Sequence, residues 1–132
     1  MIKSDVYNYI NVLDKAADAS WLRNEAISNN IANVDTPNYK RQDVSFETEL
    51  QHALGASKFR TLDDKVSDLN GERLSHIEPR TYIDHAGFSY RLDGNNVDID
   101  TENVELASNQ IKYNALIQSI DQEFKNLKSV IK

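Results

Sequence analysis

The sequence predicts a mainly α-helical protein: long N- and C-terminal helices pair as a coiled coil, with a short helix, a polar loop and a small β-hairpin between them. Two observations lead to this prediction. Apolar or small residues recur at alternating steps of three and four near both ends of the chain, a period typical of helices that pack lengthwise. Residues 41–100 between them are polar and contain turn signals. We expect segments 1–40, 41–100 and 101–132 to form one structural domain, because 132 residues suffice for only one.

The N-terminal helix is predicted from a seam of nine positions, which are Val6, Ile10, Leu13, Ala17, Ser20, Asn24, Ile27, Ile31 and Val34. Pro37 favours an extended conformation at Thr36, and Asn33 tolerates the left-handed geometry that ends helices. The helix is therefore expected to end near Asn33, and the chain to leave it as an extended strand.

Residues 45–55 predict a short helix. Ser45 is expected to cap it, and Phe46, Leu50 and Leu54 follow at helical spacing before Gly55 ends it. The polar stretch 56–85, with an Asn70-Gly71 turn signal and Pro79, is predicted to be a loose loop.

Residues 88–99 predict a hairpin around an Asp93-Gly94 turn. This register places Tyr90 opposite Val97 and Phe88 opposite Ile99, so that apolar side chains share one face. A single hairpin is marginally stable, so we expect it to lie on the helix pair.

The C-terminal helix is predicted from about residue 101 nearly to the terminus, with Asp100 as its N-cap. Its seam has two rows: Leu106, Tyr113, Ile120 and Leu127 in one, and Gln110, Ile117, Phe124 and Ile131 in the other. Each long helix would bury only one side against the other. The pair is therefore either an isolated coiled-coil hairpin or one whose remaining faces are covered by other subunits.

The distribution of charge favours the second alternative. The net charge is −1 over residues 1–40 (4 basic, 5 acidic), −5 over 41–100 (7 and 12) and 0 over 101–132 (4 and 4). Nearly neutral ends can pack against copies of themselves, whereas the acidic middle repels polyanions. Nucleic acid is not an expected partner, because there is no basic stripe.

The sequence shows no catalytic or metal-binding pattern. His52, His76 and His85 are scattered, and the calcium-loop-like start at Asp98 lacks the glycine and glutamate that such a loop needs. No phosphate-binding glycine loop or nucleophile elbow is visible. We expect no enzyme activity, no metal and no cofactor.

No apolar run of about eighteen residues and no cleavable leader are visible, so neither a membrane span nor a cleaved signal is expected. If the protein leaves the cytoplasm, another route is expected to export it. The chain has no cysteine, which leaves the redox compartment open.

Asn30 and Asn33 admit two interpretations. They are either solvated amides at a fraying helix end, or buried amides that fix the register of one helix against another.

Two separated motifs resemble the flagellar axial protein family, and within it the B-type proximal rod proteins. The first is Asn30-Ile-Ala-Asn33, then Asp35-Thr-Pro37 and Tyr39, followed by "KRQDVSFE"; the second is "DGNNVDIDTENVELASNQIKYNA", residues 93–115. The family usually has Gly after the Pro, where this chain has Asn38, and we expect the turn to survive because Asn tolerates left-handed geometry.

The resemblance implies a structural rod subunit in which paired terminal helices line an axial channel and pack in a helical array. It implies partners that are copies of the chain, other rod proteins, the basal-body base and the export gate, and a location in the rod on the periplasmic side, reached by type III export without a cleaved signal. We expect the family motif and subunit interface to include Asn30, Ile31, Ala32, Asn33, Asp35, Thr36, Pro37, Tyr39, Asp93, Gly94, Asn95, Val97, Asp98, Asn109, Tyr113, Asn114, Ile117 and Phe124.

Phe46 to Leu50 also resembles a Phe-x-x-x-apolar element for recognition at the export gate, although an ordinary short-helix core accounts for it equally well. Two alternative functions stay open: another proximal rod subunit, and a free-standing helical adaptor or chaperone that binds one partner through its seam.

Overall fold

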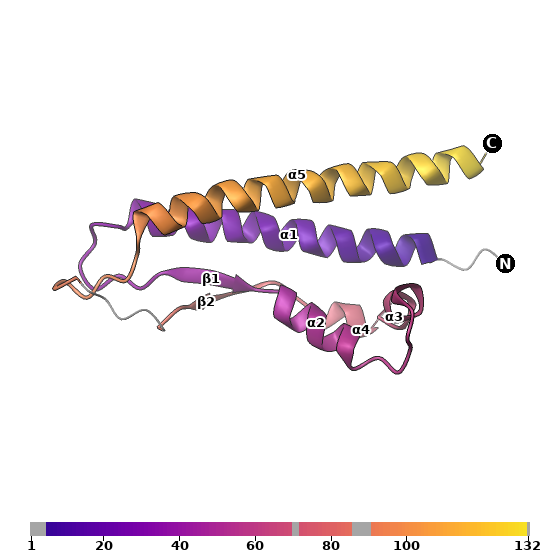
Figure 1. Ribbon diagram of the computed structural model, residues 1–132, viewed down its shortest axis with the longest axis horizontal. Helices are drawn as coiled ribbons and strands as arrows, with labels where there is room; N and C mark the ends of the chain where they lie inside the picture. The colour runs from indigo at the N-terminus through magenta and orange to yellow at the C-terminus, as the bar shows by residue number, and fades with distance from the viewer. Residues whose placement is uncertain (1–4, 70–71, 86–90, 132) are drawn as a thin grey trace.

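The computed structural model describes residues 5–69, 72–85 and 91–131. Helix α1 (Asp5–Ala32) and helix α5 (Ile99–Val130) lie side by side and run in opposite directions (Figure 1). The residues between them form a thin arm along another side of α1, which consists of β1 (Gln42–Ser45), α2 (Glu47–Gly55), α3 (Leu62–Asp68), α4 (Glu72–Ser75) and β2 (Arg80–Ile83). The predicted class, mainly α with paired terminal helices, is confirmed.

Helix α1 buries side chains on two faces. The predicted seam residues Ile10, Ala17 and Ile27 are buried. On a second face, Ala19 forms a core cluster with Phe46, Leu69 and Ile77 of the arm. The heptad pattern does not predict this face, because Ala19 lies off the seam. Two buried faces make α1 the central element, between α5 and the arm.

Helix α1 ends at Ala32, close to the predicted end at Asn33. The Asn33 amide N–H still bonds to the Asn29 carbonyl, and the chain then turns at Thr36, whose N–H bonds to the Asn33 carbonyl. Asn38 has a φ of 61°, so the expected tolerance of left-handed geometry after the Pro is confirmed.

Helix α5 begins at Ile99, and its N-cap is Asp98 rather than the predicted Asp100. The Asp98 carboxylate accepts hydrogen bonds from the backbone N–H groups of residues 100 and 101. Asp98 takes this place because it is the last residue with extended backbone before the helix.

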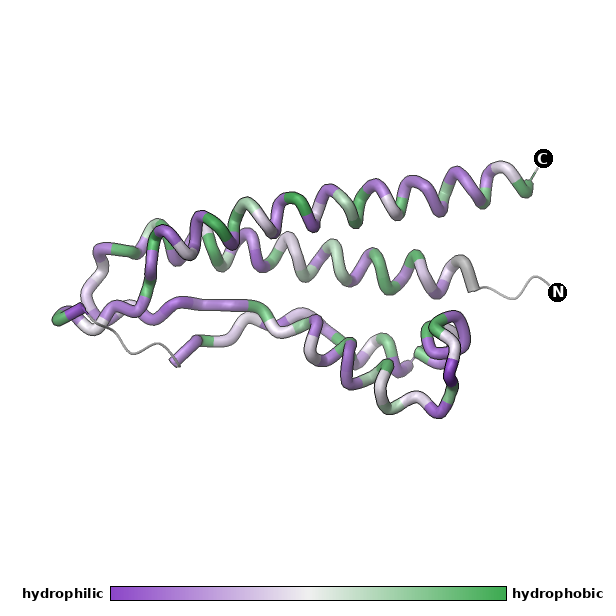
Figure 2. The backbone as a smooth tube through the Cα atoms, viewed as in Figure 1, coloured by the Kyte–Doolittle hydropathy of each residue, from purple (hydrophilic) through white to green (hydrophobic). Residues whose placement is uncertain are grey.

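One row of the predicted α5 seam is wrong. The row Leu106, Tyr113, Ile120 and Leu127 is partly buried, but the row Gln110, Ile117, Phe124 and Ile131 is exposed. The second row toward α1 is instead Glu102, Asn109, Leu116 and Glu123. Both the predicted and the observed row fit alternating steps of three and four residues. Hydrogen bonds from Asn109 to Ser20 and from Asn30 to Glu102 select the rotation of α5 about its axis that places the observed row against α1. Apolar residues therefore remain exposed on α5. Hydrophobic positions recur along the length of this helix in Figure 2.

The small β element is present, but its predicted residues are wrong. β1 pairs antiparallel with β2, from Gln42 opposite Ile83 to Ser45 opposite Arg80. Residues 91–98 contain a turn and no strand, and residues 88–90 of the first arm of the predicted hairpin lie outside the described residues. Within 91–98 the side chains of Asn95 and Asn96 bond to backbone groups of other segments, which competes with a strand ladder.

The predicted loose loop over residues 56–85 is also wrong. It contains α3, α4 and β2, and its buried apolar residues are Val66, Leu69, Leu74 and Ile77. Thr61 caps α3 by accepting a hydrogen bond from the Asp64 N–H. The Asn70-Gly71 turn signal lies outside the described residues. The stretch is polar overall because its short helices bury only one narrow face against α1.

Helix α2 is present as predicted, but Ser45 does not cap it. It begins at Glu47 with Phe46 as N-cap, and no side chain caps its first N–H groups. Phe46 is buried in the arm core, where Leu50 packs beside it.

Candidate functional site

The candidate site is the junction where the end of α1, the chain leaving it and the turn before α5 meet, at the left of Figure 1. Two backbone N–H groups link the segments: Asn38 N–H donates to the Asp93 carbonyl at 2.8 Å, and Arg41 N–H donates to Asn96 Oδ1 at 2.7 Å. The junction therefore joins the two sequence motifs, which lie more than fifty residues apart.

Asn30 lies at the centre of this junction and is fully buried. Its Nδ2 donates to the Gln42 carbonyl at 2.8 Å and to Glu102 Oε2 at 3.0 Å. Its Oδ1 accepts from the Gln42 N–H at 2.8 Å and from the Tyr39 hydroxyl at 3.3 Å. One side chain thus connects α1, the start of β1 and the first turn of α5.

Asn95 donates hydrogen bonds to carbonyl groups at the C-terminal end of α1. It is buried, and its Nδ2 lies 2.9 Å from each of the carbonyl oxygens of Asn33, Val34 and Thr36. Carbonyls at a helix C-terminus lack intrahelical donors, so a side-chain amide is a suitable partner. The Asn95 Oδ1 accepts from the Val97 N–H, which fixes the approach to α5.

The Asn33 side chain bonds to groups of its own turn. Its Nδ2 donates to the Asn29 carbonyl, and its Oδ1 accepts from the Thr36 hydroxyl. Both bonds are exposed, unlike those of Asn30. The two asparagines of the motif therefore have different environments: Asn30 links distant segments and Asn33 shapes the turn.

Gly94 and Asn38 touch in left-handed backbone, with φ of 77° and 61°. A Cβ on Gly94 would lie 2.7 Å from Asn38 Oδ1, closer than van der Waals contact allows. The position thus requires glycine for its backbone conformation and for this approach.

We expect Gly94→Ala to lower the free energy of unfolding by about 1–3 kcal/mol, because a Cβ adds left-handed strain and a clash with Asn38. Urea unfolding followed by circular dichroism measures this change. The matched control is Asn38→Gly, which relieves the strain on the other side of the contact and should stay within about 1 kcal/mol of wild type. Equal stability of Gly94→Ala and wild type would contradict this account of the turn.

Charged groups surround the asparagine bonds. Arg41 Nε donates to Glu102 Oε1 at 2.8 Å, and its Nη1 donates to Asp84 Oδ2 at 2.7 Å. Burial opposes the charge of Arg41, but the hydrogen bonds to Glu102 and Asp84 outweigh it and raise the pKa of Arg41 above its ordinary value. Glu102 itself is 1% exposed. The buried carboxylate is thus paired with Arg41 and bonded by Asn30.

A second ion cluster attaches the arm to both helices. Arg23 of α1 donates to the two carboxylate oxygens of Glu47, each at 2.6 Å, and to the Val44 carbonyl at 2.8 Å. This hydrogen bonding from Arg23 lowers the pKa of Glu47 to about 2, and Lys112 of α5 bonds to the same carboxylate. Glu47 therefore stays ionised down to strongly acidic pH.

Sequence reasoning missed several junction residues, namely Arg23, Arg41, Asp84, Asn96 and Glu102. The signal for Glu102 was its heptad position, since it precedes Leu106 by four residues and Asn109 by seven.

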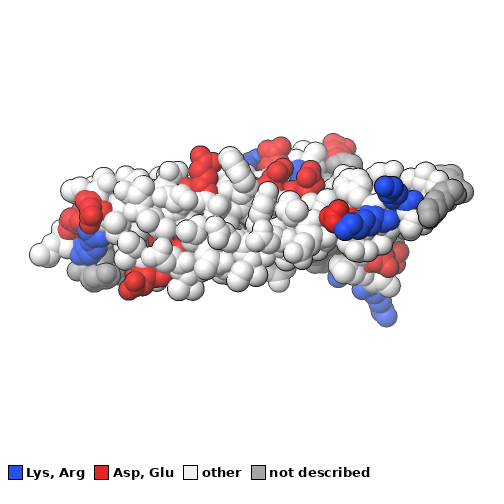
Figure 3. All heavy atoms as spheres, turned by 90° about the horizontal axis from the view of Figure 1, so that it is seen from above, with Lys and Arg blue, Asp and Glu red and all other residues white. Residues whose placement is uncertain are grey.

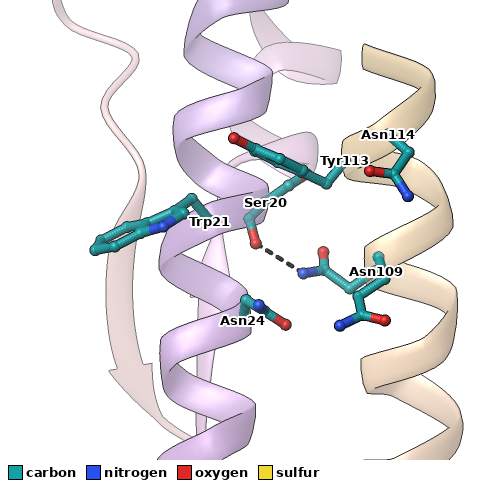
Figure 4. A pocket seen from close by; sticks show the side chains of 7 residues that line it. Ser20, Trp21, Asn24, Asn109, Tyr113 and Asn114 are labelled. Atoms are coloured by element: carbon teal, nitrogen blue, oxygen red, sulfur yellow. Dashed lines mark hydrogen bonds between the residues drawn. The ribbon is translucent and has the colours of Figure 1, made fainter. Parts of the chain in front are cut away.

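The predicted site residues separate into four groups. At the junction lie Asn30, Ile31, Ala32, Asn33, Asp35, Thr36, Pro37, Tyr39, Asp93, Gly94, Asn95, Val97 and Asp98; Val97 is buried, whereas Asp35 and Pro37 are exposed. Further along α5, Asn109, Tyr113 and Asn114 line a groove against α1 (Figure 4). Ile117 and Phe124 are exposed on α5, and Phe46 and Leu50 lie in the arm core.

Within the described ranges, no three histidine, aspartate or glutamate side chains are grouped so that they could hold a metal ion. No helix in the part of the chain that the structure describes is long and apolar enough to span a bilayer. The junction consists of amides, carbonyls and paired charges that bond to one another. Its chemistry is suited to holding segments together.

Comparisons with known proteins show the family. Residues 10–40 match the family model described as flagella basal body rod protein. The chain is 35% identical to the flagellar basal body rod protein FlgB of Bacillus subtilis over 119 residues, which cover 90% of this chain and 89% of the relative. It is 37% identical to FlgB of Borreliella burgdorferi (87% and 89% covered) and 30% identical to FlgB of Escherichia coli K12 (83% and 82%). At these identities over most of both lengths, the chain belongs to the FlgB family of flagellar basal body rod proteins.

Proposed function

We propose that the chain is a structural subunit of the flagellar basal body rod that associates with copies of itself and with other rod proteins through α1 and α5. Family membership supports the rod assignment, and the family is one of structural rod proteins. The junction supports a structural role, because its side chains link three segments into one unit.

The observation that supports self-association is the outer side of α5. Large apolar residues remain exposed on α5 although it is already packed on α1, and they form two rows on the helix, Val104 with Ile111 and Ile117 with Phe124. Seen from the α5 side, the central strip of the molecule has few charged groups, which lie mostly along its margins and ends (Figure 3). An exposed apolar and weakly charged helix face of this length favours coverage by neighbouring helices.

We place the assembled chain in the proximal rod on the periplasmic side, next to the basal-body base, and propose export through the flagellar type III gate without a cleaved signal. The sequence resemblance supports this route. If Phe46 and Leu50 are recognised at the gate, recognition must precede folding, because Phe46 is buried in the folded chain.

The test is deletion of this protein in its own host, followed by complementation with the full-length chain. We expect cells that lack it to be non-motile and to yield basal bodies without a rod, and the full-length chain to restore both. Purified basal bodies are examined by electron microscopy and by immunoblotting for the chain. Rods of normal length in its absence would overturn the proposal.

The number of copies in purified basal bodies distinguishes a rod subunit from the alternative function, that of a helical adaptor or chaperone. A rod subunit is present in several copies per basal body and stays with the rod after purification. A helical adaptor or chaperone would instead saturate one partner in the cytoplasm and be absent from the rod.

A further inference from the structure

A groove between α1 and α5 lies midway along the helix pair, away from the junction (Figure 4). Its volume is about 310 Å³, and it is lined by Ser20, Trp21 and Asn24 of α1 and Asn109, Gln110, Tyr113 and Asn114 of α5. Most of these side chains are amides or hydroxyls, in a place where paired helices usually bury apolar groups.

Two amide oxygens in this groove are buried without a hydrogen-bond partner among the described residues. They are Asn24 Oδ1 and Asn109 Oδ1. Asn109 is 4% exposed, and its Nδ2 donates to the Ser20 carbonyl at 2.7 Å. That bond orients the Asn109 amide, so that its oxygen is the atom left to accept (Figure 4). Buried acceptors of this kind are normally satisfied, so these two oxygens are available to a donor from outside the described residues.

The lining indicates what kind of donor fits. None of the seven lining residues is a carboxylate, lysine or arginine. A cationic side chain in the groove would lose its hydration without gaining a counter-charge. An uncharged amide group can donate hydrogen bonds to both oxygens without that loss of hydration. An amide side chain is therefore the donor that fits this groove.

The exposed face of α5 offers such groups. Between residues 106 and 120 the only charged residue is Lys112. The same stretch exposes the amides of Gln110, Asn114 and Gln118 next to the apolar side chains of Ile111 and Ile117. Gln110 and Asn114 line the groove of their own chain, so Gln118 is the exposed amide that an uncharged helix of a second copy offers to this groove.

We propose that this groove is the docking site for residues 106–120 of a second copy, and that an amide of that helix donates to Asn24 Oδ1 and Asn109 Oδ1. This docking proposal rests on the proposed self-association and names the surfaces that take part in it. A polar pair inside an otherwise apolar helix interface disfavours shifted alignments, because any shift leaves the amides unpaired. The groove thus sets the register between neighbouring subunits.

The first measurement locates the neighbour. Trp21, at the edge of the groove and exposed, is replaced by p-benzoylphenylalanine in the full-length chain, and basal bodies are irradiated after purification. We expect an adduct of twice the chain mass, with mass spectrometry mapping the attachment to residues 106–120. An adduct with a different rod protein, or none, would overturn the proposal.

The second measurement tests the amides. Asn24→Leu keeps the size of the side chain and removes the buried acceptor, so the monomer should melt at the same or a higher temperature. The yield of the Trp21 adduct should fall by about tenfold. The matched control is Asn11→Leu, the same change at an exposed position on α1 outside the groove, which should leave the yield unchanged.

An unchanged yield with Asn24→Leu would show that the amides do not receive a neighbour and would overturn the inference alone. Absence of the wild-type chain from purified basal bodies would instead refute the proposed function. The two failures are therefore distinguishable.

Discussion

Phe124→Asp, and likewise Ile117→Asp, is expected to abolish incorporation of the chain into basal bodies and to stop motility. Both side chains are exposed in the isolated chain, Phe124 at 52% and Ile117 at 43%. If neighbouring helices cover them, each Asp places an unpaired carboxylate in an apolar interface, which costs several kcal/mol per subunit. Swimming assays and immunoblots of purified basal bodies measure the loss.

The isolated monomer should be little changed by the same substitutions, because neither residue faces α1. Circular dichroism of the purified variants tests this, and export into the medium or periplasm is assayed separately. Ser119→Asp is the control, since it adds the same charge on a different side of α5. Normal swimming with Phe124→Asp would mean that this face of α5 has no neighbour in the rod.

Asn30→Ala is expected to destabilise the folded monomer itself. It removes the Asn30 partner of the Gln42 N–H and carbonyl and the amide donor to Glu102 Oε2, while Arg41 stays bonded to Glu102 Oε1. At about 1–3 kcal/mol for each buried group left unpaired, the free energy of unfolding should fall by about 3 kcal/mol or more. Chemical unfolding followed by circular dichroism gives the value, and assembly should fall with it.

Two neighbouring substitutions separate this effect from helix propensity. Asn29→Ala, at an exposed position, should be neutral or slightly stabilising, because Ala has the better helix propensity. Asn33→Ala loses only exposed local bonds and should cost less than about 1 kcal/mol. If Asn30→Ala behaved like Asn29→Ala, the hydrogen bonds of Asn30 would contribute nothing to the junction.

The two interpretations of the asparagines could not be decided from the sequence. Asn30 and Asn33 are both amides near a predicted helix end, and nothing local distinguishes them. What separates them is Glu102, 72 residues away from Asn30, which accepts its hydrogen bond. The functional interpretation thus applies to Asn30, through contacts within one chain, and the contribution of these residues to a subunit interface stays a prediction.

The sequence by itself determined the local features. The periods of α1 and α5, the end of α1 near Asn33 and the left-handed turn at Asn38 all follow from preferences of residues within a few positions of one another. The two motifs that indicate the family are likewise contiguous stretches. The spacing of the apolar residues predicted two paired helices, but it did not determine which face of each helix is buried.

The tertiary structure decided which side of each element is covered. The row of Asn109 rather than that of Ile117 faces α1 because Asn109 bonds to Ser20, 89 residues away. β1 pairs with β2, and residues 91–98 form no strand, because the side chains of Asn95 and Asn96 bond to backbone groups at the junction. The arm packs on Ala19 through Phe46, Leu69 and Ile77. A local period is compatible with several such arrangements, and only contacts between distant residues make one of them lowest in free energy.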